Sequence, residues 1–160
     1  MLRLDRSDAP MHHSPMPFFH DQSRDQLRLV YVNAWRKRRE GLPMEPVEAQ
    51  VADVIDLHPE YQAALAAPDT VLDRDYSPEG GQSNPFLHMG LHLAVRDQLA
   101  TDRPPGIRSA FNDVAKRLGD AHDAEHRLIE CLAETLWEAQ RAGLPPDEAA
   151  YLMRVRKLLR

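Results

Sequence analysis

Two pairs of histidines with helical spacing are the residues of this chain best suited to chemistry. His88 and His92 lie four residues apart in NPFLHMGLHLAVRDQL, and His122 and His126 have the same spacing in GDAHDAEHRLIECL. On an α-helix, residues four apart share one face, with Cβ atoms about 6 Å apart, so both imidazoles can reach one ion. The spacing therefore predicts two histidine pairs, each suited to binding a metal.

Two glutamates fall on the same kind of apolar helical face as the histidines. Glu125 lies between His122 and His126, and Glu48 lies at the centre of the apolar stripe in PVEAQVADVID. A lone buried carboxylate is costly unless it takes up a proton, pairs with a cation or binds a metal. The predicted metal ligands are therefore His88, His92, His122, His126, Glu48 and Glu125.

Mixed imidazole and carboxylate donors suit iron, manganese or zinc. The ligand set is large enough for one octahedral ion or for two ions. A ligating imidazole usually uses its second nitrogen in a hydrogen bond to an oxygen or a neighbouring group. We expect Tyr31 and His58, the latter in the segment LHPEY, to support the ligands in this way.

The segment HDAEH also matches the HxxEH motif of inverzincins, in which two histidines bind zinc and the glutamate acts as a base. Peptidase activity is not predicted, because the motif leaves His88 and His92 without a role and no substrate-binding strand is apparent. The chemistry of the motif can still apply, since Glu125 could take a proton from a metal-bound water. Glu125 is therefore the candidate base, and no other catalytic residue is assigned.

The composition of the 160-residue chain favours helices: aromatic residues make up only 6%, alanine and leucine are plentiful, and β-branched residues are sparse. The predicted fold is an all-α, single-domain bundle of about five to six helices. A net charge of −5 does not favour a nucleic-acid partner, and no apolar run is long enough to span a membrane. A cytoplasmic location is expected. The single cysteine, Cys131, permits no internal disulfide, and its helical phase opposite His122 predicts a surface thiol.

Caps, prolines and apolar periodicity divide the chain into elements. Residues 1–20 are predicted to be a disordered leader, in which translation could start at Met11 or Met16, and residues 21–160 a helical domain. A turn-rich connection over 66–84 either covers the site or only joins helices. Helices are predicted over about 21–39, 45–57, 85–100, 105–118 and 120–142, with a last one beginning after Gly143.

Four segments of the chain resemble a known family. NPFLHMGLHLAVRDQ, HPEY, RLGDAHDAEH and LWEAQRAG are similar to a bacterial family catalogued as domain of unknown function 1841, over roughly residues 18–159. The resemblance implies a compact helical protein of proteobacterial type. It implies no reaction, substrate or catalytic residue.

Two functions of different classes follow from the sequence. The first is a metal-binding helical bundle that uses inward-facing histidine pairs and glutamate; its reaction is unassigned, and if it is an enzyme, metal-activated water or dioxygen chemistry is natural. The alternative is a non-enzymatic structural or protein-interaction module whose histidines and glutamates form a buried hydrogen-bond network. A homo-oligomer or a protein partner is left open, and no membrane partner is expected.

Overall fold

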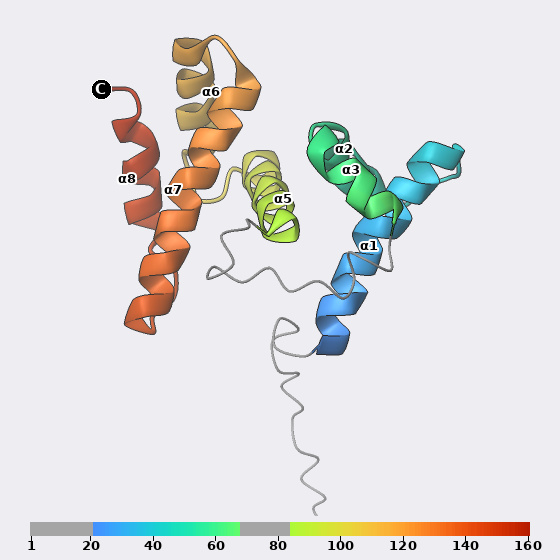
Figure 1. The fold of residues 1–160 in the computed structure, drawn as a ribbon. Helices are drawn as coiled ribbons and strands as arrows, with labels where there is room; N and C mark the ends of the chain where they lie inside the picture. Colours follow the sequence, from blue (N-terminus) through green and yellow to red (C-terminus); the bar gives the residue numbers. More distant parts are fainter. Residues whose placement is uncertain (1–20, 68–83) are drawn as a thin grey trace, which may run out of the picture.

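The computed structural model describes residues 21–67 and 84–160, and this part of the chain is all-α, without a strand (Figure 1). None of its helices is long and apolar enough to cross a membrane. The predicted leader and most of the 66–84 connection lie outside the described residues. The helices are α1 (Asp21–Glu40), α2 (Pro46–Asp56), α3 (Pro59–Ala66), α5 (Pro85–Thr101), α6 (Ile107–Leu118), α7 (Ala121–Ala142) and α8 (Glu148–Lys157).

The all-α prediction is confirmed, but the described residues form seven helices instead of five to six. The additional helix is α3, which lies in a stretch without a predicted helix, between the segments 45–57 and 85–100. Pro59 does not stop the chain here but opens α3, because proline at the first helical position loses no intrahelical hydrogen bond. The eight-residue helix is too short to show a clear apolar period.

Side-chain caps fix where the two histidine-bearing helices begin. The Asn84 side chain accepts hydrogen bonds from the backbone N–H groups of Phe86 and Leu87 at 3.0 and 3.3 Å. Asp120 caps α7 in the same way, accepting from the N–H of His122 at 2.7 Å. Each cap satisfies amide groups that the first turn leaves free. The starts of α5 and α7, and with them the phase of their histidines, are therefore set locally.

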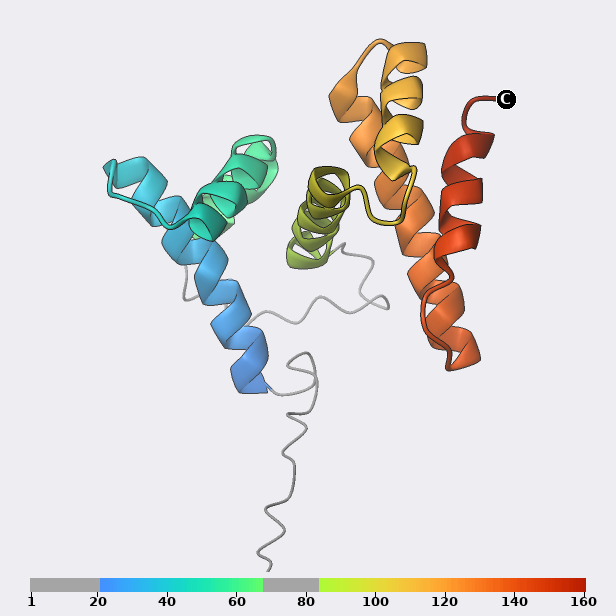
Figure 2. The same ribbon diagram turned by 180° about the vertical axis from the view of Figure 1, so that it is seen from behind.

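Helix α5 lies between two groups of helices (Figures 1 and 2). We refer to α1, α2 and α3 as the first lobe and to α6, α7 and α8 as the second lobe. α5 packs against α2 on one side and against α6 and α7 on the other. The first core consists of buried residues of the first lobe with Phe86 and Met89, and the second core of buried residues of the second lobe with Val95.

Ion pairs hold the helices within each lobe. In the first lobe, Arg38 of α1 binds Asp53 at 2.9 Å and also Asp56, both on α2. In the second lobe, Arg154 of α8 pairs with Glu134 at 3.6 Å and also with Glu138, both on α7. These pairs are partly exposed, so each contributes little to stability, and burial of the two cores supplies most of it.

The prediction that Cys131 is a surface thiol is wrong. Cys131 is buried in the second core, and burial raises the pKa of its thiol. The physical reason is that α5, α6 and α8 all pack against α7, so the buried arc of α7 is wider than a single apolar stripe. The thiol is therefore a core group with little reactivity.

We predict that Met89→Ala lowers the free energy of unfolding by about 2–5 kcal/mol, because Met89 is fully buried where α5 meets the first lobe. Urea denaturation followed by circular dichroism measures the change. Met153→Ala is the matched control: Met153 is 57% exposed, so its loss should change stability by less than about 0.5 kcal/mol. Equal effects of the two substitutions would contradict the described packing of α5.

Candidate metal centre

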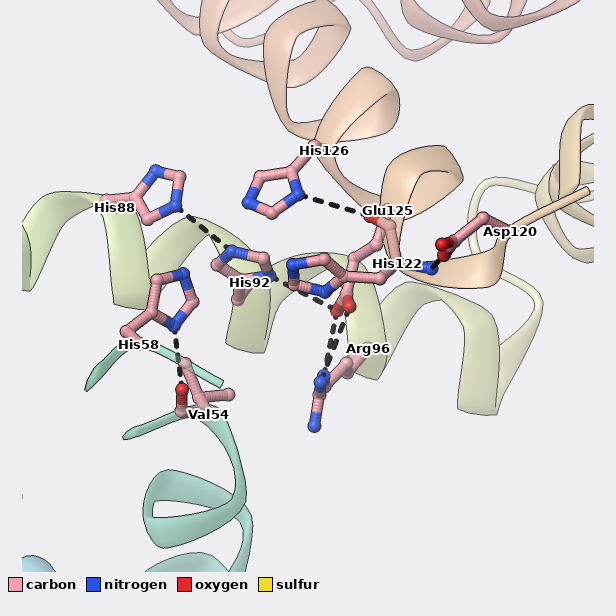
Figure 3. A network of polar contacts seen from close by, with 9 residues as sticks. All are labelled: Val54, His58, His88, His92, Arg96, Asp120, His122, Glu125 and His126. Carbon is pink, nitrogen blue, oxygen red and sulfur yellow. Dashed lines mark hydrogen bonds and ion pairs between the residues drawn. The ribbon is translucent and has the colours of Figure 1, made fainter. Parts of the chain in front are cut away.

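Four histidines from three parts of the fold come together between the lobes. They are His58 at the start of α3, His88 and His92 on α5, and His126 on α7, and one ring nitrogen of each lies within 4.8 Å of the others. Figure 3 shows the four rings pointing toward one another. His58 and His92 are buried, and the other two are half-buried. We call these four residues the histidine cluster; it unites three predicted ligands with His58, which the sequence assigns only a supporting role.

The histidine pair on α5 has the separation that a shared ion requires. The Nε2 atoms of His88 and His92 lie 3.1 Å apart. Two nitrogens bound to one ion at about 2.1 Å each are separated by about 3.0 Å at an octahedral angle and about 3.4 Å at a tetrahedral one. The observed distance therefore needs little adjustment on binding.

His58 presents an unused nitrogen to the cluster. Its Nδ1 lies 2.7 Å from the carbonyl oxygen of Val54, one turn earlier, so the Nδ1–H donates to that oxygen. The proton on Nδ1 leaves Nε2 with a lone pair in the neutral ring. This Nε2 is buried and has no hydrogen-bond partner within the described residues. A buried nitrogen of this kind is either unsatisfied or a ligand.

His126 is oriented in the same way. Its Nδ1 lies 3.2 Å from the carbonyl oxygen of His122, again one turn earlier, and the other edge of the ring faces His88 (Figure 3). The rings of His126 and His88 are nearly parallel, with centroids 5.4 Å apart. Backbone carbonyl groups therefore favour the tautomer with a free Nε2 in both His58 and His126.

Glu125 contacts His92 and is not one of the four converging histidine-cluster residues. Its Oε1 lies 3.5 Å from Nδ1 of His92 and accepts a hydrogen bond from Nε of Arg96 at 2.8 Å. Burial by itself raises the pKa of Glu125, but its hydrogen bonds with His92 and Arg96 outweigh this effect and lower the pKa to about 2. So acidic a carboxylate is a weak base, which favours an orienting role over the predicted proton transfer.

The sequence reasoning missed Arg96. A signal for it was available, because Arg96 follows His92 by four residues and so shares its face of α5. Its guanidinium supplies the cation that makes a buried carboxylate at position 125 tolerable. The same interaction ties α5 to α7.

Glu48 does not join the cluster. It is in the first turn of α2, where its carboxylate accepts the backbone N–H of Glu45 at 3.0 Å and pairs with Lys37 Nζ at 2.6 Å. The hydrogen bond from Lys37 is the largest cause of the lowered pKa of Glu48. The sequence correctly predicts that Glu48 needs a partner, but that partner is a cation on α1 instead of a metal.

The two other predicted residues border the site or lie in the core. The ring centroid of His122 lies 4.4 Å from that of His126 and 6.2 Å from that of His92, but His122 is not one of the four converging histidines. Its Nδ1 is buried and lacks a hydrogen-bond partner in the described part of the chain. Tyr31 packs edge-on against Phe86 in the first core. His122 therefore borders the cluster, while Tyr31 contributes to packing.

Two members of the cluster, His88 and His92, have lowered pKa values. Burial, together with the nearby His92, His58 and His126, lowers the pKa of His88 to about 4. Burial also lowers the pKa of His92, although Glu125 opposes that shift. A metal binds the neutral ring, so these groups have their lone pairs available at neutral pH.

We predict that the metal-free protein loses stability as the pH is lowered from about 6.5 toward 4. His88 in the unfolded chain takes up a proton near pH 6.5, whereas in the folded protein its pKa is about 4, so protons favour unfolding in this interval. Urea denaturation at a series of pH values measures the loss. His88→Gln should make the dependence shallower, and an unchanged slope in this variant would contradict the assignment.

The fold and the site define an all-α protein with a histidine cluster between two lobes. The chain belongs to the family described as domain of unknown function (DUF1841), whose family model matches residues 23–157 and therefore spans the whole cluster. This confirms the resemblance seen in the sequence. No curated protein and no solved structure matches the chain.

Proposed function

We propose that this protein binds one divalent transition-metal ion through the histidine cluster. The observation that carries the proposal is the buried, unpartnered Nε2 of His58, which faces three further imidazoles whose ligand atoms lie within 4.8 Å of it and of one another. Three of the four rings use Nδ1 toward a backbone carbonyl or a carboxylate. This arrangement of outer hydrogen bonds is typical of histidines that ligate metals.

The donor set narrows the choice of ion. Four imidazole nitrogens without a carboxylate or thiolate suit zinc, copper, nickel, cobalt or ferrous iron. Manganese, one of the three ions expected from the sequence, fits less well because neither Glu48 nor Glu125 provides an oxygen ligand. Zn²⁺ is the natural first ion to test, and the Glu125 carboxylate offsets part of its charge.

A buried hydrogen-bond network, the alternative function, fits the geometry less well. Such a network stabilises a core only when its buried polar atoms are paired. Nε2 of His58, Nδ1 of His92 and Nδ1 of His122 make no hydrogen bond within the described residues, although Nδ1 of His92 lies 3.5 Å from the Glu125 carboxylate. Metal coordination would satisfy the first of these nitrogens, whereas a network leaves all three without a hydrogen bond.

Metal-activated water or dioxygen chemistry would need an exchangeable position on the ion. His58 and His92 are buried, so that position would lie toward the half-buried His88 and His126. Four imidazoles around a tetrahedral ion leave no such position, whereas a larger coordination number does. A purely structural ion is therefore the simpler form of this proposal.

We predict that the protein binds one Zn²⁺ per chain and that His92→Gln weakens binding at least about 100-fold, since losing a ligand should cost as much as losing an outer partner or more. His122→Gln is the matched control and should stay within about tenfold of the parent. The parent should carry His12→Ala, His13→Ala and His20→Ala, because these three residues are the other histidines of the chain. Competition with a chromophoric chelator measures affinity.

The same experiment decides between the two functions. A parent protein that takes up none of Zn²⁺, Cu²⁺, Ni²⁺, Co²⁺ and Fe²⁺ would overturn the metal proposal in favour of the hydrogen-bond network. Greater loss of affinity in His122→Gln than in His92→Gln would show that the wrong four histidines are assigned.

We predict that Glu125→Gln weakens Zn²⁺ binding by about 10–100-fold, because removing an outer hydrogen-bond partner loosens the ligand that it orients. Glu48→Gln is the matched control: its carboxylate pairs with Lys37, so affinity should not change. Chelator competition measures both, and the absorption spectrum of bound Co²⁺ reports the geometry. Equal affinities and identical Co²⁺ spectra for the two variants would rule out the orienting role.

A further inference from the structure

The histidine cluster takes ligands from both sides of the molecule. His58 belongs to the first lobe, His126 to the second, and His88 and His92 to the helix between them. The His58 ring lies 4.6 Å from that of His92 and 6.2 Å from that of His126, measured between centroids. An ion at this place would therefore be bonded to both lobes at once.

Apolar packing does not continue across this region. The buried residues fall into two separate cores, one on each side of the cluster, and α5 contributes Phe86 and Met89 to the first and Val95 to the second. In the described chain, α1, α2 and α3 do not pack extensively on α6, α7 or α8. The two lobes consequently meet through α5 and the polar layer of histidines.

Polar contacts attach α5 firmly to the second lobe. Arg96 binds Glu125 of α7 at 2.8 Å, and the Tyr151 hydroxyl of α8 donates to the Gln98 side chain at 2.7 Å. Arg108 of α6 donates to the carbonyl oxygen at position 99 at 2.9 Å, near the end of α5. Because of these hydrogen bonds, we expect α5 to move together with the second lobe.

The attachment of α5 to the first lobe has a different character. It includes apolar packing by Phe86 and Met89, with Tyr31 edge-on to Phe86 and the Arg28 guanidinium 4.9 Å above the same ring. At the cluster itself, the first lobe contributes His58, and the ring of Tyr61 stacks on His58 with its centroid 6.4 Å from that of His88. Without a metal, the buried Nε2 lone pair of His58 faces other imidazoles with no hydrogen bond to compensate, which weakens this contact.

We propose that the metal ion docks the first lobe onto α5 and the second lobe, with His58 as the docking ligand. The inference rests on the proposed function and adds a consequence to it. An ion that needs all four imidazoles binds only the docked arrangement, so it shifts the population toward that arrangement. The three ligands on α5 and α7 remain together without His58, so an ion can still bind there, more weakly and without docking.

Distances between spin labels test the docking. The labels are placed on Val47→Cys of α2, which is 62% exposed, and Met153→Cys of α8, which is 57% exposed, in a Cys131→Ala background. Double electron–electron resonance should give a broad distance distribution without metal and a narrow one with one equivalent of Zn²⁺. A control pair within the second lobe, Leu118→Cys with Met153→Cys, should give the same narrow distribution in both states.

The substitution His58→Gln separates docking from binding. We expect this variant to retain Zn²⁺ with at least about 10-fold lower affinity. The distribution of distances between the labels on α2 and α8 should stay broad. Hydrogen exchange of the unlabelled wild-type chain provides a second readout if labelling disturbs the fold. Zn²⁺ should slow amide exchange in α2, α3, α5 and α7 of the wild type, but only in α5 and α7 of His58→Gln.

The outcomes distinguish this inference from the proposed function. If Zn²⁺ binds the wild type and the α2–α8 distribution is equally narrow without metal, the docking inference is wrong and the site assignment stands. If Zn²⁺ narrows the distribution in His58→Gln as well, His58 is not the docking ligand. If the wild type binds no ion, the proposed function itself fails.

Discussion

The arrangement of the site depends on contacts at Nδ1 that decide which nitrogen of three of its imidazoles is free. In His58 and His126, the Nδ1–H donates to the backbone carbonyl one turn earlier, and in His92 the Nδ1 lies beside the Glu125 carboxylate. The opposite edge of each ring then faces the cluster (Figure 3). Because a neutral imidazole has one donor and one acceptor nitrogen, the two hydrogen bonds place the lone pair of His58 and His126 on Nε2, and the nearby carboxylate favours the same tautomer in His92.

The need to bring these imidazoles together accounts for the position of α5 between the two cores. A helix that serves two cores has buried residues on more than one face, so its apolar residues do not form a single stripe. Met89 faces the first core and Val95 the second, while His88 and His92 occupy the level where the two cores part. A polar layer at this level separates the cores and also places imidazoles within reach of both lobes.

Glu48 and Glu125 show that similar residues take different roles when different helices pack against them. Both lie among apolar neighbours in the sequence, and both carry lowered pKa values in the structure. Glu48 pairs with Lys37 of α1 and accepts a hydrogen bond from the backbone N–H of Glu45, so it links α1 to α2. Glu125 meets His92 and Arg96 of α5, so it acts on the cluster. Helical phase alone cannot distinguish these cases, since it does not indicate which helix lies opposite.

Caps and a 3.6-residue period are local properties, so the amino-acid pattern alone predicts the helical class, the extent of the longer helices, and the shared helix faces of His88 with His92 and of His122 with His126. Only the tertiary structure decided that His58 joins the cluster and that His126 reaches it while His122 borders it. Helical period gives the face on which a residue lies, but not the level at which another helix crosses that face. That level depends on how α7 packs against α5 and where the short α3 begins.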